Sequence, residues 1–211
     1  MSKVFQSVLL GVCGSVLSCS VLAAPTNFSY SSIGIAFGKQ TLDDPIVFFG
    51  ERYEEMGIGG IGLSVQFADD VLFLETGSQA ASNEGPNTSL TSSVAFIGLG
   101  AVQAVSDSVD VYGKLDLLSG TSEACLGAIC AKDDDTGSAF GLGLKAWFDD
   151  ARTIAGRLSY SSSKYSKDTK RSSSTSFGLS AYVSEKHELG FGFSNGESSR
   201  VTSFSYDYYF K

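Results

Sequence analysis

The chain has 211 residues and a formal net charge of −8, with 43% hydrophobic, 12% aromatic and only 18% charged residues. This length fits one domain. The acidic balance argues against a nucleic-acid partner, because phosphate binding needs a basic surface. The aromatic content argues against a disordered chain, since disordered segments are poor in aromatic residues.

The first 23 residues are predicted to be a cleaved secretory signal peptide. Lys3 supplies the positive start, and the apolar stretch from Val8 to Leu17 is too short to span a bilayer as a helix. Cleavage after Ala23 leaves residues 24–211 as the mature domain. A second interpretation, lipid attachment at Cys19, stays open.

Two cysteines remain in the mature domain, Cys125 and Cys130. An even number of cysteines in an exported protein favours a disulfide, because the compartment is oxidising. A metal site would need further ligands, and no histidine is near this pair. We therefore predict a small loop closed by a Cys125–Cys130 disulfide, with no metal and no cofactor.

The mature chain repeats one pattern, in which large apolar residues alternate with Gly, Ser or polar residues at a period of two. In 188–194, for example, Leu189, Phe191 and Phe193 alternate with Gly190 and Gly192. This pattern is typical of strands with one apolar face, and tilted strands of ~9–11 residues can cross a bilayer. Ten strands are predicted near residues 28–38, 57–67, 71–79, 90–104, 109–119, 138–148, 152–164, 174–183, 188–195 and 200–210.

The connections between these strands alternate in length. Short ones fall near 68–70, 105–108, 149–151 and 184–187, and long ones at 39–56, 80–89, 120–137 and 165–173. Short turns at one rim and long loops at the other are typical of membrane barrels. We predict an all-β, up-and-down antiparallel transmembrane β-barrel of ten strands. A barrel of eight strands is the alternative, reached by merging or discarding one hairpin.

The signal peptide, the alternating strands and the aromatic-rich last strand, Phe204 to Phe210, resemble the small outer-membrane β-barrels of Gram-negative bacteria. This group includes OmpA-like, OmpX-like and opacity-like barrels. The resemblance covers the whole mature chain and implies residence in the outer membrane. In the family the last residue is usually aromatic, whereas here Lys211 follows Phe210.

The faces of the predicted strands differ in a way that favours a membrane barrel over a soluble β-sandwich. One face carries Leu, Ile and Phe in nearly every strand, and the other is mostly Gly and Ser with a few charges of both signs. A charge facing lipid at mid-membrane would cost ~2–4 kcal/mol, so these charges are expected to point into the lumen and pair there. The predicted lumen charges are Glu75, Asp110, Lys114, Asp116, Lys145, Arg157 and Asp207.

The sequence gives little support for an enzyme. The single histidine, His187, falls in a predicted short turn, away from the rim where barrel hydrolases place their base. Gly57, Gly59 and Gly62 match a dinucleotide fingerprint, but a strand follows them instead of the helix that motif needs. We therefore expect neither catalytic nor cofactor-binding residues.

Charged clusters occupy the predicted long loops. Carboxylates cluster at Asp43–Asp44 and Asp133–Asp135, and residues 164–171 are basic. The acidic spacing fits no EF-hand, and we expect solvated loops. The expected role is non-enzymatic: a structural or adhesive envelope protein that contacts outer-membrane lipid and lipopolysaccharide, and host or phage ligands through its loops. The alternative is a narrow channel for ions or small polar solutes.

Overall fold

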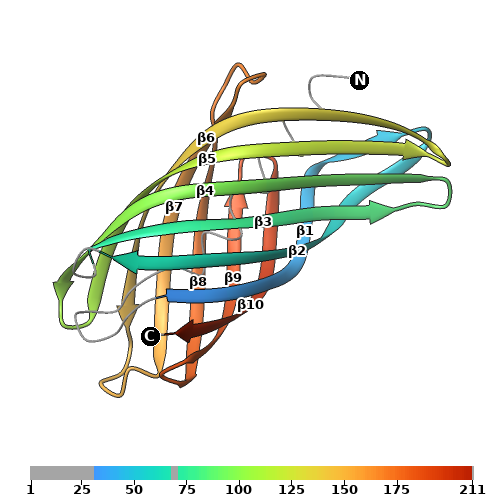
Figure 1. Ribbon diagram of the computed structural model, residues 1–211. Coiled ribbons are helices and arrows are strands. Elements are labelled where there is room, and N and C mark those ends of the chain that lie inside the picture. The colour runs from blue at the N-terminus through green and yellow to red at the C-terminus, as the bar shows by residue number, and fades with distance from the viewer. Residues whose placement is uncertain (1–30, 68–70, 211) are drawn as a thin grey trace.

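The computed structural model describes residues 31–67 and 71–210, which form ten antiparallel strands closed into one barrel (Figure 1). The closure joins β1 to β10, with a register that runs from Ser31 opposite Phe210 to Leu42 opposite Ser199. The predicted ten-strand barrel is confirmed, and the eight-strand alternative is wrong. The predicted signal peptide, residues 1–23, lies outside the described residues. The strands are β1 (Ser31–Phe48), β2 (Glu51–Phe67), β3 (Leu72–Glu84), β4 (Thr88–Ser106), β5 (Val109–Leu126), β6 (Ile129–Trp147), β7 (Ile154–Tyr165), β8 (Ser172–Ser184), β9 (His187–Gly196) and β10 (Ser199–Phe210).

The two ends of the barrel differ. At one end, which we call the turn end, Ser31 is paired with Phe210, and residues 107–108 and 185–186 connect neighbouring strands. The opposite end, which we call the tip end, carries the hairpins that β1 to β6 extend to the right in Figure 1. Strands β1 to β6 are longer than most of β7 to β10, so the barrel wall is taller on one side.

Three of the four predicted long loops are wrong, because most of their residues continue the strands. Residues 39–56 form the ends of β1 and β2, joined only by Phe49 and Gly50. Both of these residues have positive φ, 48° and 84°, as a two-residue hairpin turn requires. Residues 80–89 and 120–137 are likewise mostly paired strand, and of the four predicted long loops only the one between β7 and β8, residues 166–171, is a loop of six residues. The predicted short connection between β6 and β7 is as long, at residues 148–153.

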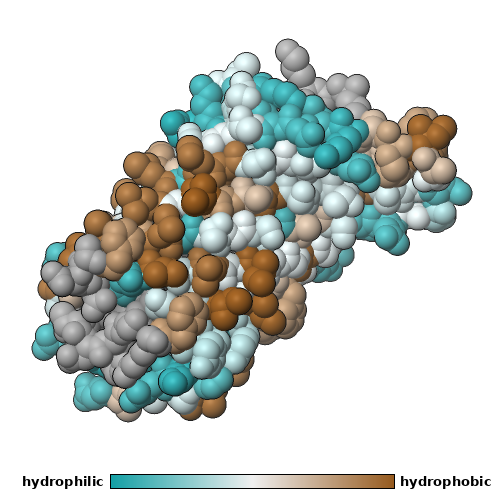
Figure 2. Space-filling view, in the orientation of Figure 1, coloured by the Kyte–Doolittle hydropathy of each residue, from teal (hydrophilic) through white to brown (hydrophobic). Residues whose placement is uncertain are grey.

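Side chains alternate between the inside and the outside of the wall, as the period of two requires. All ten strands place large apolar residues on the outside, among them Ile35, Leu63 and Leu142, which are 38–57% exposed. Figure 2 shows such residues, in brown, over the central and lower-left part of the visible face. Within the described residues, no helix has the length and hydropathy needed to cross a membrane.

Candidate functional site: the barrel interior and the hairpin tips

All seven predicted lumen charges are buried on the inner face of the barrel, each at most 9% exposed. Three of them, Glu75 of β3 and Lys114 and Asp116 of β5, form what we call the first ionic cluster. Lys114 donates a hydrogen bond to Glu75, and its Nζ lies 3.2 Å from Asp116 Oδ2. Gly98 of β4 pairs with Asp116 and leaves it room, because a Cβ there would lie 1.9 Å from Oδ1.

The second ionic cluster lies closer to the turn end and is centred on Glu188 of β9. Its Oε2 lies 3.6 Å from Lys145 Nζ, and its Oε1 lies 3.7 Å from a terminal nitrogen of Arg157. The Tyr209 hydroxyl donates a 2.5 Å hydrogen bond to the same carboxylate. Asp110 and Asp207 are buried nearby and interact electrostatically with Lys145.

Sequence reasoning missed Glu188, although a signal for it was present. Glu188 shares the parity of Gly190 and Gly192, which belong to the small, inward-facing set of β9. It is the first residue of the predicted strand 188–195, and it is not among the predicted lumen charges. A strict reading of parity would have placed it in the lumen.

An aromatic layer surrounds Lys145 at the turn end. Its Nζ lies 4.9 Å from the ring centroid of Tyr182 and 5.4 Å from that of Trp147, within the range of cation–π attraction. These two rings are themselves 4.9 Å apart, and Lys145 donates a hydrogen bond to the Tyr182 hydroxyl. Lys145 is therefore held by rings as well as by carboxylates.

The half of the interior nearer the tip end contains most of the buried apolar side chains, with Gln40, Gln79 and Ser92 buried among them. We call the apolar residues that fill it the apolar layer; Leu90 of β4 is 0% exposed there and Met56 of β2 only 1%. Of its two tyrosines, Tyr53 donates its hydroxyl to the Thr88 carbonyl oxygen over 3.0 Å. The apolar layer consists of Leu42, Ile46, Tyr53, Met56, Ile58, Ala81, Leu90, Val94, Leu118, Ala124, Tyr165 and Val201.

The turns at the tip end are joined to one another by hydrogen bonds. The backbone N–H of Asn87, in the β3–β4 turn, donates to Glu51 Oε1 over 3.0 Å, and the N–H of Gly127, in the β5–β6 turn, donates to the Asn87 carbonyl over 2.9 Å. A hydrogen bond from the Thr88 hydroxyl contributes most to lowering the pKa of Glu51 below its usual value. Three separate hairpins thus share one hydrogen-bonded end.

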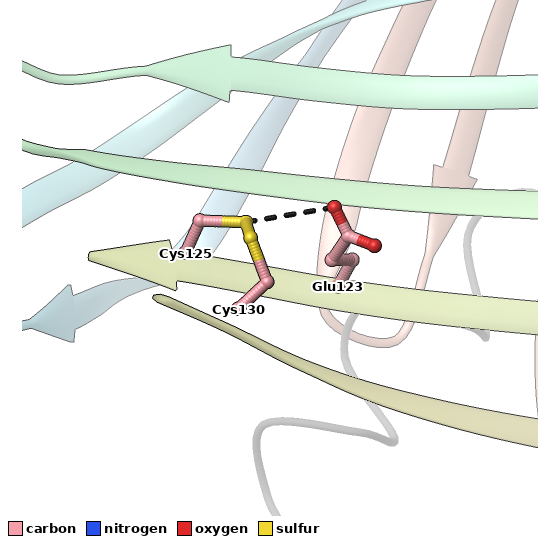
Figure 3. A group of neighbouring side chains, drawn as sticks. All are labelled: Glu123, Cys125 and Cys130. Atoms are coloured by element: carbon pink, nitrogen blue, oxygen red, sulfur yellow. Dashed lines mark hydrogen bonds between the residues drawn. A yellow bond between two sulfur atoms is a disulfide. The ribbon is translucent and has the colours of Figure 1, made fainter. Parts of the chain in front are cut away.

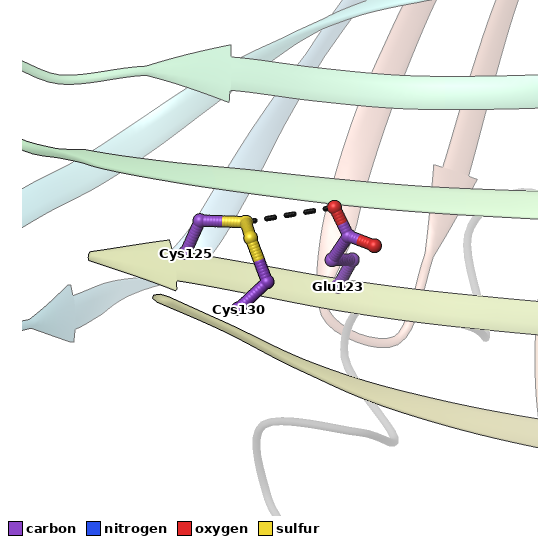
Figure 4. The surroundings of a disulfide bond; sticks show 3 residues. All are labelled: Glu123, Cys125 and Cys130. Carbon is purple, nitrogen blue, oxygen red and sulfur yellow. Dashed lines mark hydrogen bonds between the residues drawn. A yellow bond between two sulfur atoms is a disulfide. The ribbon is translucent and has the colours of Figure 1, made fainter. Parts of the chain in front are cut away.

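Cys125 and Cys130 are joined in a disulfide across the β5–β6 hairpin (Figure 3). The two residues are direct partners in the strand pairing, with Cα atoms 4.0 Å apart. A carboxylate oxygen of Glu123 approaches Cys125 Sγ to 3.5 Å (Figure 4). These three residues are close enough for a metal site, but sulfurs joined to each other offer no thiolate, so the group does not fit a zinc ion.

The predicted acidic and basic loop clusters lie against each other. Lys167 Nζ, in the β7–β8 loop, lies 2.5 Å from Asp133 Oδ1, and its backbone N–H donates to Asp135 Oδ2 over 3.1 Å. The Ser166 hydroxyl also donates to Asp135. The loop is therefore anchored on β6, and part of its charge is neutralised within the chain.

His187 and the glycine motif have structural surroundings. His187 begins β9 at the turn end, where its Nδ1 is 2.7 Å from the Tyr206 hydroxyl and its ring packs on Tyr206 and Tyr208. Gly57 and Gly59 lie within β2, paired with residues of β1 and β3. In that position they form part of the barrel wall, and they do not precede a helix.

Comparison with solved structures supports this architecture. The translocator domain of the autotransporter NalP from Neisseria meningitidis is 7% identical and has a TM-score of 0.52, covering 89% of this chain and 91% of its own. The β domain of the Bordetella autotransporter BrkA is 11% identical with a TM-score of 0.51, covering 87% and 100%. A comparison with protein-family models finds no match, and neither does one with curated proteins.

An apolar outer wall on all ten strands, around charges buried inside, fits a barrel surrounded by lipid. The chain has the fold of an outer-membrane β-barrel. In such barrels the short turns face the periplasm and the longer connections face the outside of the cell. Here the connections at the two ends have similar lengths, and the distinguishing feature is that β1 to β6 extend beyond the apolar band only at the tip end. We therefore assign the tip end to the outside of the cell and the turn end to the periplasm.

Proposed function

We propose that this outer-membrane barrel is sealed and non-enzymatic, and that it acts in surface interaction through its extracellular tips. The observation that carries the proposal is the apolar layer, which fills the extracellular half of the interior with side chains at most 8% exposed. An ion crossing this layer would lose most of its hydration among mainly apolar side chains, with the amides of Gln40 and Gln79 and the hydroxyl of Ser92 as buried polar groups beside them, and burying a charge is very costly.

The arrangement of charges supports the same function. In the periplasmic half, Lys114 lies between two carboxylates, and Lys145 and Arg157 share Glu188. Buried ions in such clusters replace water with fixed partners. His187, the single histidine, packs with tyrosines at the periplasmic end, which supports a structural role for it.

The rival function is a narrow channel for ions or small polar solutes, and planar-bilayer recording separates the two. We expect no stable unitary conductance from the wild-type protein, with insertion verified by flotation of the same preparation. The rival would be supported by unitary steps whose ion selectivity changes in the variant Asp116→Asn. The matched control, Asp134→Asn, alters an exposed carboxylate near the tips and should leave any selectivity unchanged.

A further inference from the structure

The three joined hairpin tips carry exposed apolar side chains. Phe49, in the β1–β2 turn, is 71% exposed, and Ile129, at the start of β6, is 77% exposed. Val47 and Leu126 add further apolar surface beside them. Figure 2 shows a brown patch at the upper right, where Figure 1 places the ends of these hairpins. We call this surface the tip platform.

The tip platform is separate from the band that faces lipid. Along β6, Ile129 is nine positions from Ser138, the partner of the exposed band residue Leu117 of β5, which corresponds to about 30 Å of strand at ~3.3 Å per residue. The outward residues between them include Lys132, Asp134 and Thr136, which are exposed and polar. The apolar residues of the platform therefore stand in water, at a distance from the membrane.

The platform is held rigidly, because its turns are tied together. Asn87 bonds both to Glu51 beside the β1–β2 turn and to Gly127 in the β5–β6 turn. The Cys125–Cys130 disulfide links β5 to β6 next to Ile129. Exposed apolar residues on an ordered surface mark interaction sites, since leaving them in water is unfavourable. Little ordering entropy would be lost on binding to such a surface.

The surroundings of the platform define the chemistry of its partner. Segments 39–57, 78–94 and 119–138, which build the three hairpins, carry ten acidic and three basic side chains, a net formal charge of −7. Lys167 neutralises part of this charge at Asp133, and Arg200 neutralises part of it at Asp43. An apolar centre within an acidic surface is complementary to a protein segment with apolar side chains flanked by lysine or arginine. An opposing anionic membrane would be repelled by the same charge.

We propose that the tip platform is a docking surface for a cationic, amphipathic protein segment. This inference rests on the proposed function and specifies its partner class. Phe49 and Ile129 would be covered by the apolar side chains of the segment, and the acidic hairpins would contact its basic residues. The strands of the barrel supply the rigid support, and no step of the binding needs the lumen.

The test uses the full-length protein in nanodiscs and a labelled synthetic peptide with a central Phe-Leu pair flanked by lysines. We expect the peptide to bind wild-type protein above the level of empty nanodiscs. The double variant Phe49→Ser, Ile129→Ser should bind at least about tenfold more weakly, because apolar area is lost from the contact. The matched control Val105→Ser removes an exposed apolar side chain at the periplasmic end and should bind like wild type.

Three results would overturn the proposal. The double variant could bind as tightly as wild type, or a peptide with a Gly-Gly centre could bind as tightly as the Phe-Leu peptide, which would indicate charge attraction alone. Binding of wild-type nanodiscs to zwitterionic vesicles, but not to the peptide, would indicate a membrane as the occupant. Conductance recorded on the same preparation separates the two proposals: a sealed barrel without peptide binding contradicts only the platform, whereas unitary steps contradict the sealed barrel.

Discussion

Removing the cation of the first ionic cluster tests whether the barrel interior is dry. In the variant Lys114→Met, Glu75 and Asp116 are left facing each other in a buried site. At the 3.2 Å separation of Lys114 Nζ and Asp116 Oδ2, the Coulomb attraction is about 5 kcal/mol for an effective dielectric constant of ~20. Part of this offsets the desolvation of the charges, so the expected loss of unfolding free energy is ~3–5 kcal/mol.

The assay is urea unfolding in detergent micelles, followed by tryptophan fluorescence. Trp147 is the only tryptophan of the chain and lies inside the barrel wall near the periplasmic end, so its emission reports on the whole structure. The matched control is Lys132→Met, which removes a cation 3.4 Å from Asp134 where both side chains are more than half exposed. This exposed pair should contribute at most ~1 kcal/mol.

A water-filled channel predicts a different result for the same pair of variants. Water would screen Glu75 and Asp116 after the lysine is removed, and the loss would fall to the ~0–1 kcal/mol of an exposed pair. Equal effects of Lys114→Met and Lys132→Met would therefore refute the sealed interior. The double variant Lys114→Met, Glu75→Gln should recover part of the stability, because it removes one of the two uncompensated charges.

Other parts of the molecule give further predictions. Leu90→Ala should lower the unfolding free energy by ~2–5 kcal/mol in the same urea assay, because it leaves a cavity at a fully buried position. Cys125→Ser should make the β5–β6 tip more sensitive to protease. Because the disulfide closes so short a loop, the free energy of local opening should fall by at most ~2 kcal/mol, and the urea midpoint should stay unchanged. Asp149 accepts hydrogen bonds in the β6–β7 turn, and the bond from Thr153 contributes most to lowering its pKa below the usual 3.8. Its stabilisation should therefore be present above pH 3.8 and be lost as the pH falls through the lower folded-state value, so the urea midpoints of wild type and Asp149→Asn should converge in acid. A pH dependence that persists in Asp149→Asn but disappears in the neighbouring control Asp150→Asn would contradict this assignment.

The barrel itself could be predicted from the sequence because its strands obey one local rule. Within the membrane, lipid outside and a narrow lumen inside require apolar residues at one parity and small or charged residues at the other. This rule located all ten strands and placed charges such as Lys145 and Asp207 on the inner face. The contacts among these charges were beyond reach, because they depend on which strands lie opposite one another. The pairing of Lys167 with Asp133 likewise joins segments whose proximity only the folded barrel creates.

The predicted loops failed for a reason that also supports the sealed interior. In β4, the outward residues Ile97 and Leu99 are both 51% exposed, whereas the apolar residues Leu90 and Val94, nearer the tip, point inward and are 0% and 2% exposed. Inward and outward positions therefore keep alternating along the strand. The large apolar residues, however, mostly occupy the inward positions up to Val94 and the outward positions from Ile97 onward. A reversal is required where the medium outside changes from lipid to water, since the apolar face must then turn inward to be buried. This is why a search for one consistent apolar face interprets the extensions as loops. The same reversal places an apolar layer in the extracellular half of the lumen, so in the proposed sealed barrel the strands that raise the tip platform above the membrane would also close the lumen beneath it.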